Sequence, residues 1–339
     1  MKSGLSKTLL LAVVTSVILI SCGGGGSGNL VASNSGGIGG TGVVYGPITG
    51  FGSIFVNGFE IDIASAGITA DGSDVTESAL KLGMIVKVDG TFDANNLTGT
   101  ATAVTYKDNL EGPITSIDLA SNQLVVLGQT VIVSGTTNFE DSVTFADPFG
   151  FTDLAVGNVI EVSGLVDNTG AIRASHVEKK ADSFSSGSAI IEVKGTIQNL
   201  DTGAGTFQIN TLVVDYFSDS PTLPQGGLAD GQYVEVKGMS FGGSGEFIAT
   251  SIETEDEGIG SESGHDGDYV EIKGYVTSVI SPNQFVVDNQ SIEIDSSTRY
   301  EGGSLGDIQA GVRLEVEGTI TSGVLLARKI GFEDGGEDH

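Results

Sequence analysis

The chain has 339 residues, a formal net charge of −29 at pH 7, 52 glycines, one cysteine and no tryptophan. This acidity repels nucleic acid phosphates and anionic lipid headgroups, and a single cysteine excludes an intrachain disulfide. The length leaves room for two or more domains, and frequent Val, Ile and Thr broken by glycine indicate an all-β protein with many tight turns.

The N-terminus has the pattern of an export signal. Lys2 and Lys7 precede an apolar stretch, residues 9–20, that is shorter than the roughly 20 residues needed to span a bilayer. The stretch ends in Leu-Ile-Ser-Cys at residues 19–22, which resembles the lipobox of bacterial lipoproteins. The alternatives are an ordinary secretory signal followed by a free thiol, or an N-terminal membrane helix.

The lipobox resemblance implies that residues 1–21 are a lipoprotein signal peptide and that Cys22 carries the lipid, palmitate among its chains. The protein would then be held at a membrane of the cell envelope by this anchor. Gly23, rather than Asp, follows the cysteine. By resemblance to lipoproteins of two-membrane bacteria, this favours the outer membrane, on its periplasmic face or at the cell surface. Glycine and serine dominate residues 22–42, which we expect to form a flexible tether.

One strand pattern occurs four times, each time beginning and ending with glycine. The leading glycines are 74, 74 and 80 residues apart, which indicates a tandem repeat. The four segments are Gly83–Gly90, Gly157–Gly164, Gly231–Gly238 and Gly311–Gly318.

Further strands recur in step with this segment and delimit four β-repeats. A repeat of about 65–75 residues forms a sheet that must close to hide its edges, which favours a small OB-like β-barrel. An immunoglobulin-like sandwich would need about 100 residues. We therefore predict tandem barrels as repeat 1 (43–107), repeat 2 (108–180), repeat 3 (189–254) and repeat 4 (269–333).

Alternation within the glycine-bounded strand predicts which side chains form the core. Val86 and Val88, with their counterparts in the other repeats, should point inward, because successive side chains of a strand alternate between faces. The charged residues between them should face water. This charged column consists of Lys87, Glu161, Glu235 and Glu315.

The segments between repeats differ in length and composition. Residues 107–109 leave repeats 1 and 2 almost no linker, so we expect a nearly rigid pair. Residues 180–188 read as a flexible linker, and residues 253–268 as an acidic, mobile one. The C-terminal residues 333–339 are also acidic.

The chain carries no recognisable catalytic or ligand-binding motif. His176, His265 and His339 lack metal-ligand spacing, and no nucleophile elbow, phosphate-binding loop or complete EF-hand occurs. We therefore predict no catalytic, cofactor-binding or metal-binding residues and no cofactor. Two alternatives stay open: a carboxylate pair for glycoside hydrolysis, and calcium bound by the linker acids Asp256, Glu257, Glu262, Asp266 and Asp268.

The opening Gly-x-Ile, the Val-Glu-Val strand and the closing Ile172–Glu178 resemble the bacterial family called domain of unknown function 5666. The resemblance runs from Val43 to about Glu333, with extra residues at 220–229 and 296–310. It implies exported, often lipid-anchored repeat proteins, and it supplies no activity and no functional residues.

These observations favour a lipid-anchored, non-enzymatic binding, scaffold or spacer protein of the cell envelope. Its expected partners are the membrane, through the anchor, and an envelope protein or glycan, but not nucleic acid. The alternatives are an envelope polysaccharide hydrolase and a calcium-rigidified surface stalk.

Overall fold

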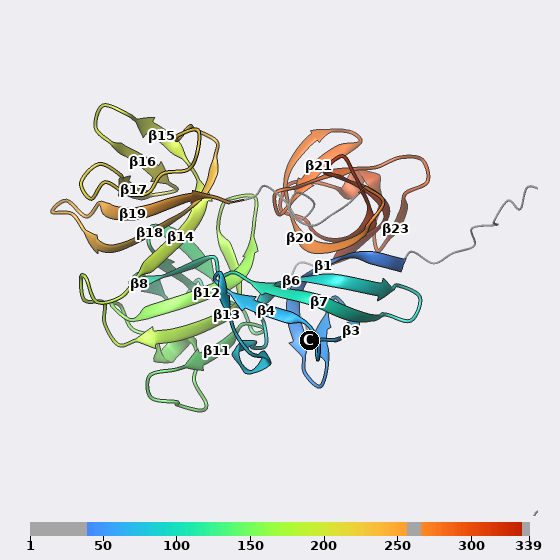
Figure 1. Ribbon diagram of the computed structural model, residues 1–339, viewed down its shortest axis with the longest axis horizontal. Helices are drawn as coiled ribbons and strands as arrows, with labels where there is room; N and C mark the ends of the chain where they lie inside the picture. The colour runs from blue at the N-terminus through green and yellow to red at the C-terminus, as the bar shows by residue number, and fades with distance from the viewer. Residues whose placement is uncertain (1–38, 256–265, 334–339) are drawn as a thin grey trace, which may run out of the picture. The chain divides into compact units, whose positions relative to one another are not determined.

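The computed structural model describes residues 39–255 and 266–333 (Figure 1). The predicted signal peptide, Cys22 and nearly all of the tether lie outside the described residues. Within these ranges the chain forms 25 β-strands and three single-turn 3₁₀ helices. None of these helices has the length and hydropathy needed to cross a membrane.

Repeat 1 is a closed barrel. Its ring runs β1–β2–β3–β7–β6 and back to β1, with β3 and β7 parallel and the other pairs antiparallel. A short hairpin of β4 and β5 extends the sheet from β7. The elements are β1 (Gly39–Gly50), β2 (Ile54–Val56), β3 (Phe59–Asp62), β4 (Gly67–Ala70), β5 (Ser73–Asp74), η1 (Glu77–Ala79), β6 (Ile85–Asp93) and β7 (Thr98–Tyr106).

Repeat 2 forms the same ring in the order β8–β9–β10–β13–β12 and back to β8. Its additional strand, β11, pairs with β13. The elements are β8 (Leu110–Asp118), β9 (Gln123–Val126), β10 (Gln129–Ile132), β11 (Asn138–Asp141), η2 (Phe151–Asp153), β12 (Val159–Val166) and β13 (Ile172–Ala181).

Repeat 3 follows the same strand order, but its first strand is bent. β14 pairs with β18, and after Ile197 the chain continues as β15, which pairs with β16. The ring is completed through β16–β17–β19–β18. The elements are β14 (Ile191–Thr196), β15 (Gln198–Asp201), β16 (Thr206–Ile209), β17 (Leu212–Asp215), β18 (Tyr233–Phe241) and β19 (Phe247–Thr254).

Repeat 4 closes as β20–β21–β22–β25–β24 and back to β20. The prediction of an all-β chain of small barrels is thus confirmed. The elements are β20 (Tyr269–Ser281), β21 (Gln284–Val287), β22 (Gln290–Glu293), β23 (Arg299–Glu301), η3 (Leu305–Asp307), β24 (Arg313–Thr321) and β25 (Val324–Glu333).

The two glycines that bound each repeated strand have different structural roles. The leading glycines, at 83, 157, 231 and 311, all adopt φ between +85° and +95°, a conformation that L-residues with a side chain rarely adopt. The closing glycines, at 90, 164, 238 and 318, lie at β-bulges. At each of these four, a Cβ would approach a carbonyl oxygen of the outgoing strand to 2.1–2.3 Å.

The predicted core valines are buried as expected. Val86 and Val88 are fully buried in β6, and so are the equivalent residues of β12, β18 and β24. Each such pair lies inside its own barrel, because the alternation of the strand places both side chains on the inner face. The equivalent residues are Ile160, Val162, Val234, Val236, Leu314 and Val316.

The opening strands also join the repeats to one another. The first half of β1 pairs with β6 on one side and in parallel with the first half of β20 on the other, as Figure 1 shows. The first half of β8 likewise joins two repeats, because it pairs with β14, here in antiparallel orientation. Repeats 1 and 4 therefore share one sheet, and repeats 2 and 3 share a second.

Residues 180–188, predicted to be a flexible linker, contact repeat 3. The ring of Phe184 meets that of Phe241 edge to face, with 5.6 Å between centroids. The backbone N–H of Gly187 donates a hydrogen bond to the carbonyl of Met239 at 2.8 Å. The segment is therefore held against repeat 3 at these two points. Phe184, an apolar residue in a segment otherwise rich in serine, was the feature of the sequence that could have indicated this contact.

Gly42 tests the pairing of repeats 1 and 4. A Cβ at this position would lie 2.0 Å from the carbonyl oxygen of Tyr269, so we expect Gly42→Val to force β1 away from β20. Overpacking of this kind costs about 1–3 kcal/mol, measured as a lower urea midpoint. Gly67→Val is the control, because Gly67 has no atom within 4 Å of the added Cβ. Equal midpoints for the two variants would show that the pairing adds no stability.

Candidate functional site

Half of the charged column does not face water, so that prediction is wrong for two of its four members. Glu161 and Glu235 are only 5 % and 7 % exposed, whereas Lys87 and Glu315 are half-buried. The alternation correctly placed all four outside their barrels. The outer face of β12, however, packs against repeat 1, whose Tyr106 hydroxyl contacts Glu161, and Glu235 is contacted by Lys194 and Lys237 of its own repeat.

Four glutamates lie opposite one another across the sheet shared by repeats 2 and 3. Glu178 of β13 faces Glu161 of β12, which faces Glu111 of β8, which faces Glu192 of β14. We call these four residues the glutamate row. Like charges directly opposite each other destabilise a sheet, so this arrangement requires cations close by.

Two lysines and a tyrosine compensate the ends of the glutamate row. Lys180 Nζ lies 2.9 Å from Glu161 and 3.6 Å from Glu178. Lys237 Nζ lies 3.2 Å from Glu192 and 2.7 Å from Glu235 of β18. From repeat 1, the hydroxyl of Tyr106 donates a 2.5 Å hydrogen bond to Glu161. Glu161 of the row is thereby covered by repeat 1 rather than by solvent.

Lys194 lies at the meeting point of repeats 1, 2 and 3. Its ammonium is 2.8 Å from the carbonyl oxygen and 2.9 Å from the carboxylate of Asp108. It is 3.1 Å from Glu192 and 3.1 Å from Glu235. We call these four residues the Lys194 cluster. The side chain of Lys194 is only 6 % exposed, so its charge depends on these carboxylates.

Two acids of the Lys194 cluster, Asp108 and Glu192, have pKa values shifted in opposite directions. Burial raises the pKa of Asp108 well above its usual range, despite the nearby Lys194. Burial acts on Glu192 too, but the hydrogen bond with Asp108 and the charges of Lys194 and Lys237 lower the Glu192 pKa to about 2. Glu192 has the lower pKa of the two because two lysines, Lys194 and Lys237, contact it.

Asp71, Asp108 and Glu192 are close enough to share a divalent cation, with ligand oxygens within 4.8 Å of one another. Asp71 is exposed as a residue, but its carboxylate accepts a 3.1 Å hydrogen bond from the Asp108 N–H, and burial raises its pKa to about 6. The ammonium of Lys194, however, already contacts Asp108 and Glu192. Lys194 takes the position that a metal ion would need.

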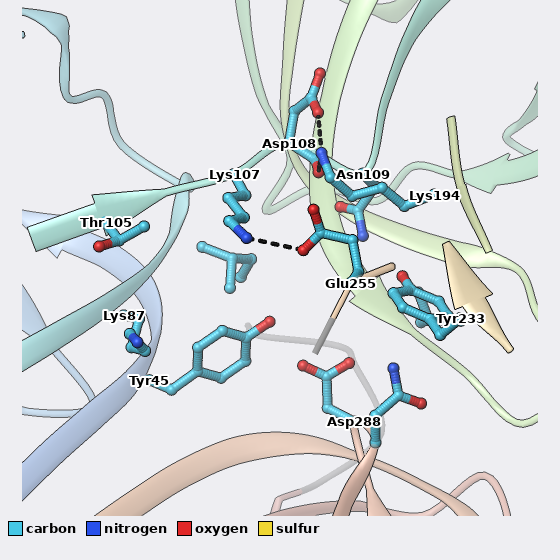
Figure 2. Close-up of a pocket in the computed structure, with 13 residues that line it drawn as sticks. Tyr45, Lys87, Thr105, Lys107, Asp108, Asn109, Lys194, Tyr233, Glu255 and Asp288 are labelled. Carbon is cyan, nitrogen blue, oxygen red and sulfur yellow. Dashed lines mark hydrogen bonds and ion pairs between the residues drawn. The ribbon is translucent and has the colours of Figure 1, made fainter. Parts of the chain in front are cut away.

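A cavity of about 160 Å³ adjoins the Lys194 cluster, and we call it the central cavity (Figure 2). All four repeats contribute to its wall. Residues 107–109, which sequence alone presents as a minimal linker, line it too. The lining residues are Tyr45, Ile85, Lys87, Thr105, Lys107, Asp108, Asn109, Val166, Lys194, Tyr233, Glu255, Asp288 and Asn289.

The lysines of the central cavity are each paired with a carboxylate. Lys107 Nζ lies 2.8 Å from Glu255, and Lys194 contacts Asp108, as the dashed lines in Figure 2 show. Lys87 Nζ lies 3.8 Å from Asp89. Asp288, in the turn between β21 and β22, lines the cavity together with Tyr45. Burial raises the pKa of Asp288, and burial beside that carboxyl raises the pKa of Tyr45 as well.

The residues singled out from the sequence do not meet at this site. His176 is buried where repeats 1 and 2 meet, with Nδ1 3.0 Å from the carbonyl oxygen of Leu82. Asp266 accepts a 2.6 Å hydrogen bond from the Ser322 N–H. Asp268 accepts one from Thr41 Oγ1 at 2.9 Å. Cys22, His265, His339 and the linker acids Asp256, Glu257 and Glu262 lie outside the described residues.

Asp108 and Glu192 are closer together than the paired carboxylates of a glycosidase. Their ligand oxygens lie within 4.8 Å of one another, whereas paired glycosidase carboxylates stand roughly 5–10 Å apart so that substrate and water fit between them. Lys194 occupies the remaining acceptor positions of this pair. The two carboxyls therefore serve as partners of Lys194, and they leave no space between them for a substrate.

Lys194→Met tests whether the Lys194 cluster holds the repeats together. We expect a loss of about 3–5 kcal/mol in the free energy of unfolding, because the variant leaves buried carboxylates without their cation. Lys81→Met is the control: Lys81 also bridges two repeats, through Glu140, but these side chains are 37 % and 33 % exposed. Its loss should stay below about 1 kcal/mol. Urea unfolding at neutral pH compares the two, and similar losses would contradict the role given to Lys194.

Glu111 tests the electrostatics of the glutamate row. Burial, with Glu161 and Glu192 nearby, raises its pKa from the ordinary 4.5 to about 7 in spite of Lys180. Protonated Glu111 therefore stabilises the fold below about pH 4.5, and this stability is lost as the pH rises through about 7.

We expect Glu111→Gln to match wild type in acid and to exceed its melting temperature above about pH 7. Glu77→Gln, at an exposed residue of η1, should change neither end of the profile. Parallel melting curves for wild type and Glu111→Gln across the whole range would refute this account.

The comparisons with known proteins agree with the repeat architecture. No curated protein matches the chain. Four segments each match one family, described as a domain of unknown function (DUF5666), and together they cover more than half of the chain. The matched residues are 41–105, 111–178, 194–253 and 273–331. The chain therefore belongs to the DUF5666 family, of which it carries four tandem copies.

Proposed function

We propose that this protein is a lipid-anchored, exported binding protein of the cell envelope, whose four repeats form one non-enzymatic scaffold. The export pattern that ends at Cys22 supports the anchor, and Gly23 supports the outer membrane as its site. The net charge of −29 opposes nucleic acid as a partner and suits a soluble body held away from anionic lipid.

The pairing of β1 with β20 is the observation that carries this proposal. A spacer works by keeping its two ends apart, as a row of independent modules does. Here Val43, at the start of repeat 1, pairs with Val270, at the start of repeat 4. The arrangement favours a closed scaffold that gathers surfaces from all four repeats over a spacer or a stalk.

The central cavity supports binding rather than catalysis. It is the place where lining residues from all four repeats converge. Glu255 and Asp108 are held in ion pairs with Lys107 and Lys194, so neither is positioned as a free general base. A cavity whose lysines are paired with carboxylates, and whose interior has room for a ligand, is better suited to binding a ligand than to catalysis.

Cys22→Ser tests the anchor. We expect the wild-type chain to sediment with membranes and to require detergent for release, because two or more acyl chains hold a protein stably in a bilayer. The variant should appear in the soluble fraction after cell disruption. Membrane sedimentation of Cys22→Ser to the same extent as wild type would exclude Cys22 as the anchor.

The same variant tests binding without the anchor. Purified Cys22→Ser chain is mixed with isolated envelopes, and the fraction that sediments is measured against protein concentration. A binding protein sediments saturably, whether its partner is a protein or a glycan. Gly42→Val in the Cys22→Ser background should sediment less than the Gly67→Val control, because it separates repeats 1 and 4. Absence of saturable sedimentation would leave a spacer as the better account.

A further inference from the structure

We propose that the central cavity binds a single neutral sugar ring. This inference deepens the proposed binding function, rests on it, and names the chemical class of the ligand. It follows from three properties of the cavity: the state of its charges, the hydrogen-bonding groups left over, and its size.

The charges of the cavity wall leave no place for an ionic ligand. Lys107 is paired with Glu255 at 2.8 Å, Lys194 with Asp108 at 2.9 Å, and Lys87 with Asp89 at 3.8 Å. Burial raises the pKa of Asp288, which lines the wall with Tyr45, so this carboxyl resists ionisation. A charged ligand would have to break one of these pairs and leave its partner buried without a counter-ion, which is unfavourable. A neutral ligand leaves every pair intact.

The groups that remain open to a ligand are neutral hydroxyls and amides. Among the described residues, the hydroxyls of Tyr233 and Thr105 and the side-chain amide of Asn289 make no hydrogen bond with the protein. The carbonyl oxygen of the Asn109 side chain accepts a 2.7 Å bond from the Gly164 N–H, which leaves its NH₂ available. Hydroxyls both donate and accept, and amides offer both functions, so together they match the mixed hydrogen bonding of sugar hydroxyls.

Tyr45 and Tyr233 stand on two sides of this space in Figure 2, with Asp288 below them. Their rings, together with Ile85 and Val166, give the cavity an apolar component. Aromatic and aliphatic surfaces suit the C–H face of a sugar ring, while the tyrosine hydroxyls reach its polar edge. One ligand that is apolar on its faces and polar around its rim satisfies both parts of the wall.

The size of the cavity limits the ligand to one ring. Pockets for drug-sized ligands measure roughly 300–1,000 Å³, whereas the central cavity measures about 160 Å³. A disaccharide would not fit inside. The ligand is therefore a free monosaccharide or a single terminal sugar of an envelope glycan, since both present the same ring to the wall.

The test uses the full chain with Cys22→Ser, so that the protein is soluble. Glucose, galactose, mannose and N-acetylglucosamine, each with its methyl glycoside, are titrated at up to several millimolar and followed by saturation-transfer NMR and calorimetry. We expect at least one of these sugars to bind. Binding of the free sugar alone identifies a free monosaccharide as the ligand, and binding of the glycoside identifies a glycan terminus.

Tyr233→Phe locates the binding in the cavity, because it removes only a hydroxyl. We expect it to weaken sugar binding about three- to tenfold, the effect of one neutral hydrogen bond, and Thr105→Val to do the same. Tyr216→Phe is the matched control: Tyr216 also lies in repeat 3, where its ring packs 5.9 Å from that of Phe207, away from the cavity.

Two results would overturn the inference. One is that none of the sugars binds, and the other is that a sugar binds with equal affinity to Tyr233→Phe and wild type. Either result is separable from the proposed function, which is measured by saturable sedimentation with envelopes. Envelope binding without sugar binding would place the recognition surface outside the central cavity.

Discussion

The packing of the repeats depends on one buried ammonium group. The chain is strongly acidic, and several of its acids lie where repeats 1, 2 and 3 meet. Lys194 contacts the carboxyls of three of them, with its Nζ at 2.9–3.1 Å from each. Two of these acids belong to repeat 3, and Asp108 belongs to the connection between repeats 1 and 2. Without this cation the carboxylates would repel one another across the interface.

Single barrels were predictable because their determinants are local. Alternation placed Val86 and Val88 in the core, and it did so correctly in every repeat because the period of a strand is two residues. The bounding glycines also have local causes. Gly83 has a positive φ, and Gly90 lies at a bulge where a carbonyl oxygen of the next strand leaves no room for a Cβ. The positions of the turn glycines and the alternation of apolar residues were therefore enough to predict the barrel.

The association of barrels was not predictable in the same way. Glu161, Glu235 and Glu315 occupy the same position in the same motif, yet the first two are buried and the third is half-buried. The motif states which face of the strand points out of the barrel, but not what covers that face. The one available signal was the short connection at residues 107–109, because it forces repeats 1 and 2 into contact. This contact buries Asp108, which then needs a cation nearby. The sequence does not indicate which one, because Lys194 lies 86 residues further along the chain.

The candidate site was missed for a related reason. Its lining residues come from all four repeats. Repeats 1 and 3 contribute equivalent positions, for example Ile85 and Tyr233, but with different residue types. Motif recognition looks for recurring residue types, so it does not find a cavity that forms only when the repeats pack. Tyr45 and Asp288 are more than two hundred residues apart, yet they line the same cavity in the structure in which β1 and β20 pair.

The β1–β20 pairing also constrains how the chain reaches its native state. Thr41 and Asp268, which are hydrogen-bonded beside this pairing, are separated by 227 residues, so this contact closes a loop that contains most of repeats 1 to 3. Until repeat 4 has been synthesised and has folded, the first half of β1 has an unpaired edge. Long-range closure of this kind is slow, and an exposed edge pairs readily with the equivalent strand of another chain. The first repeat to be synthesised thus stays open to exchange between chains until the last one has folded, which links the order of folding to domain swapping.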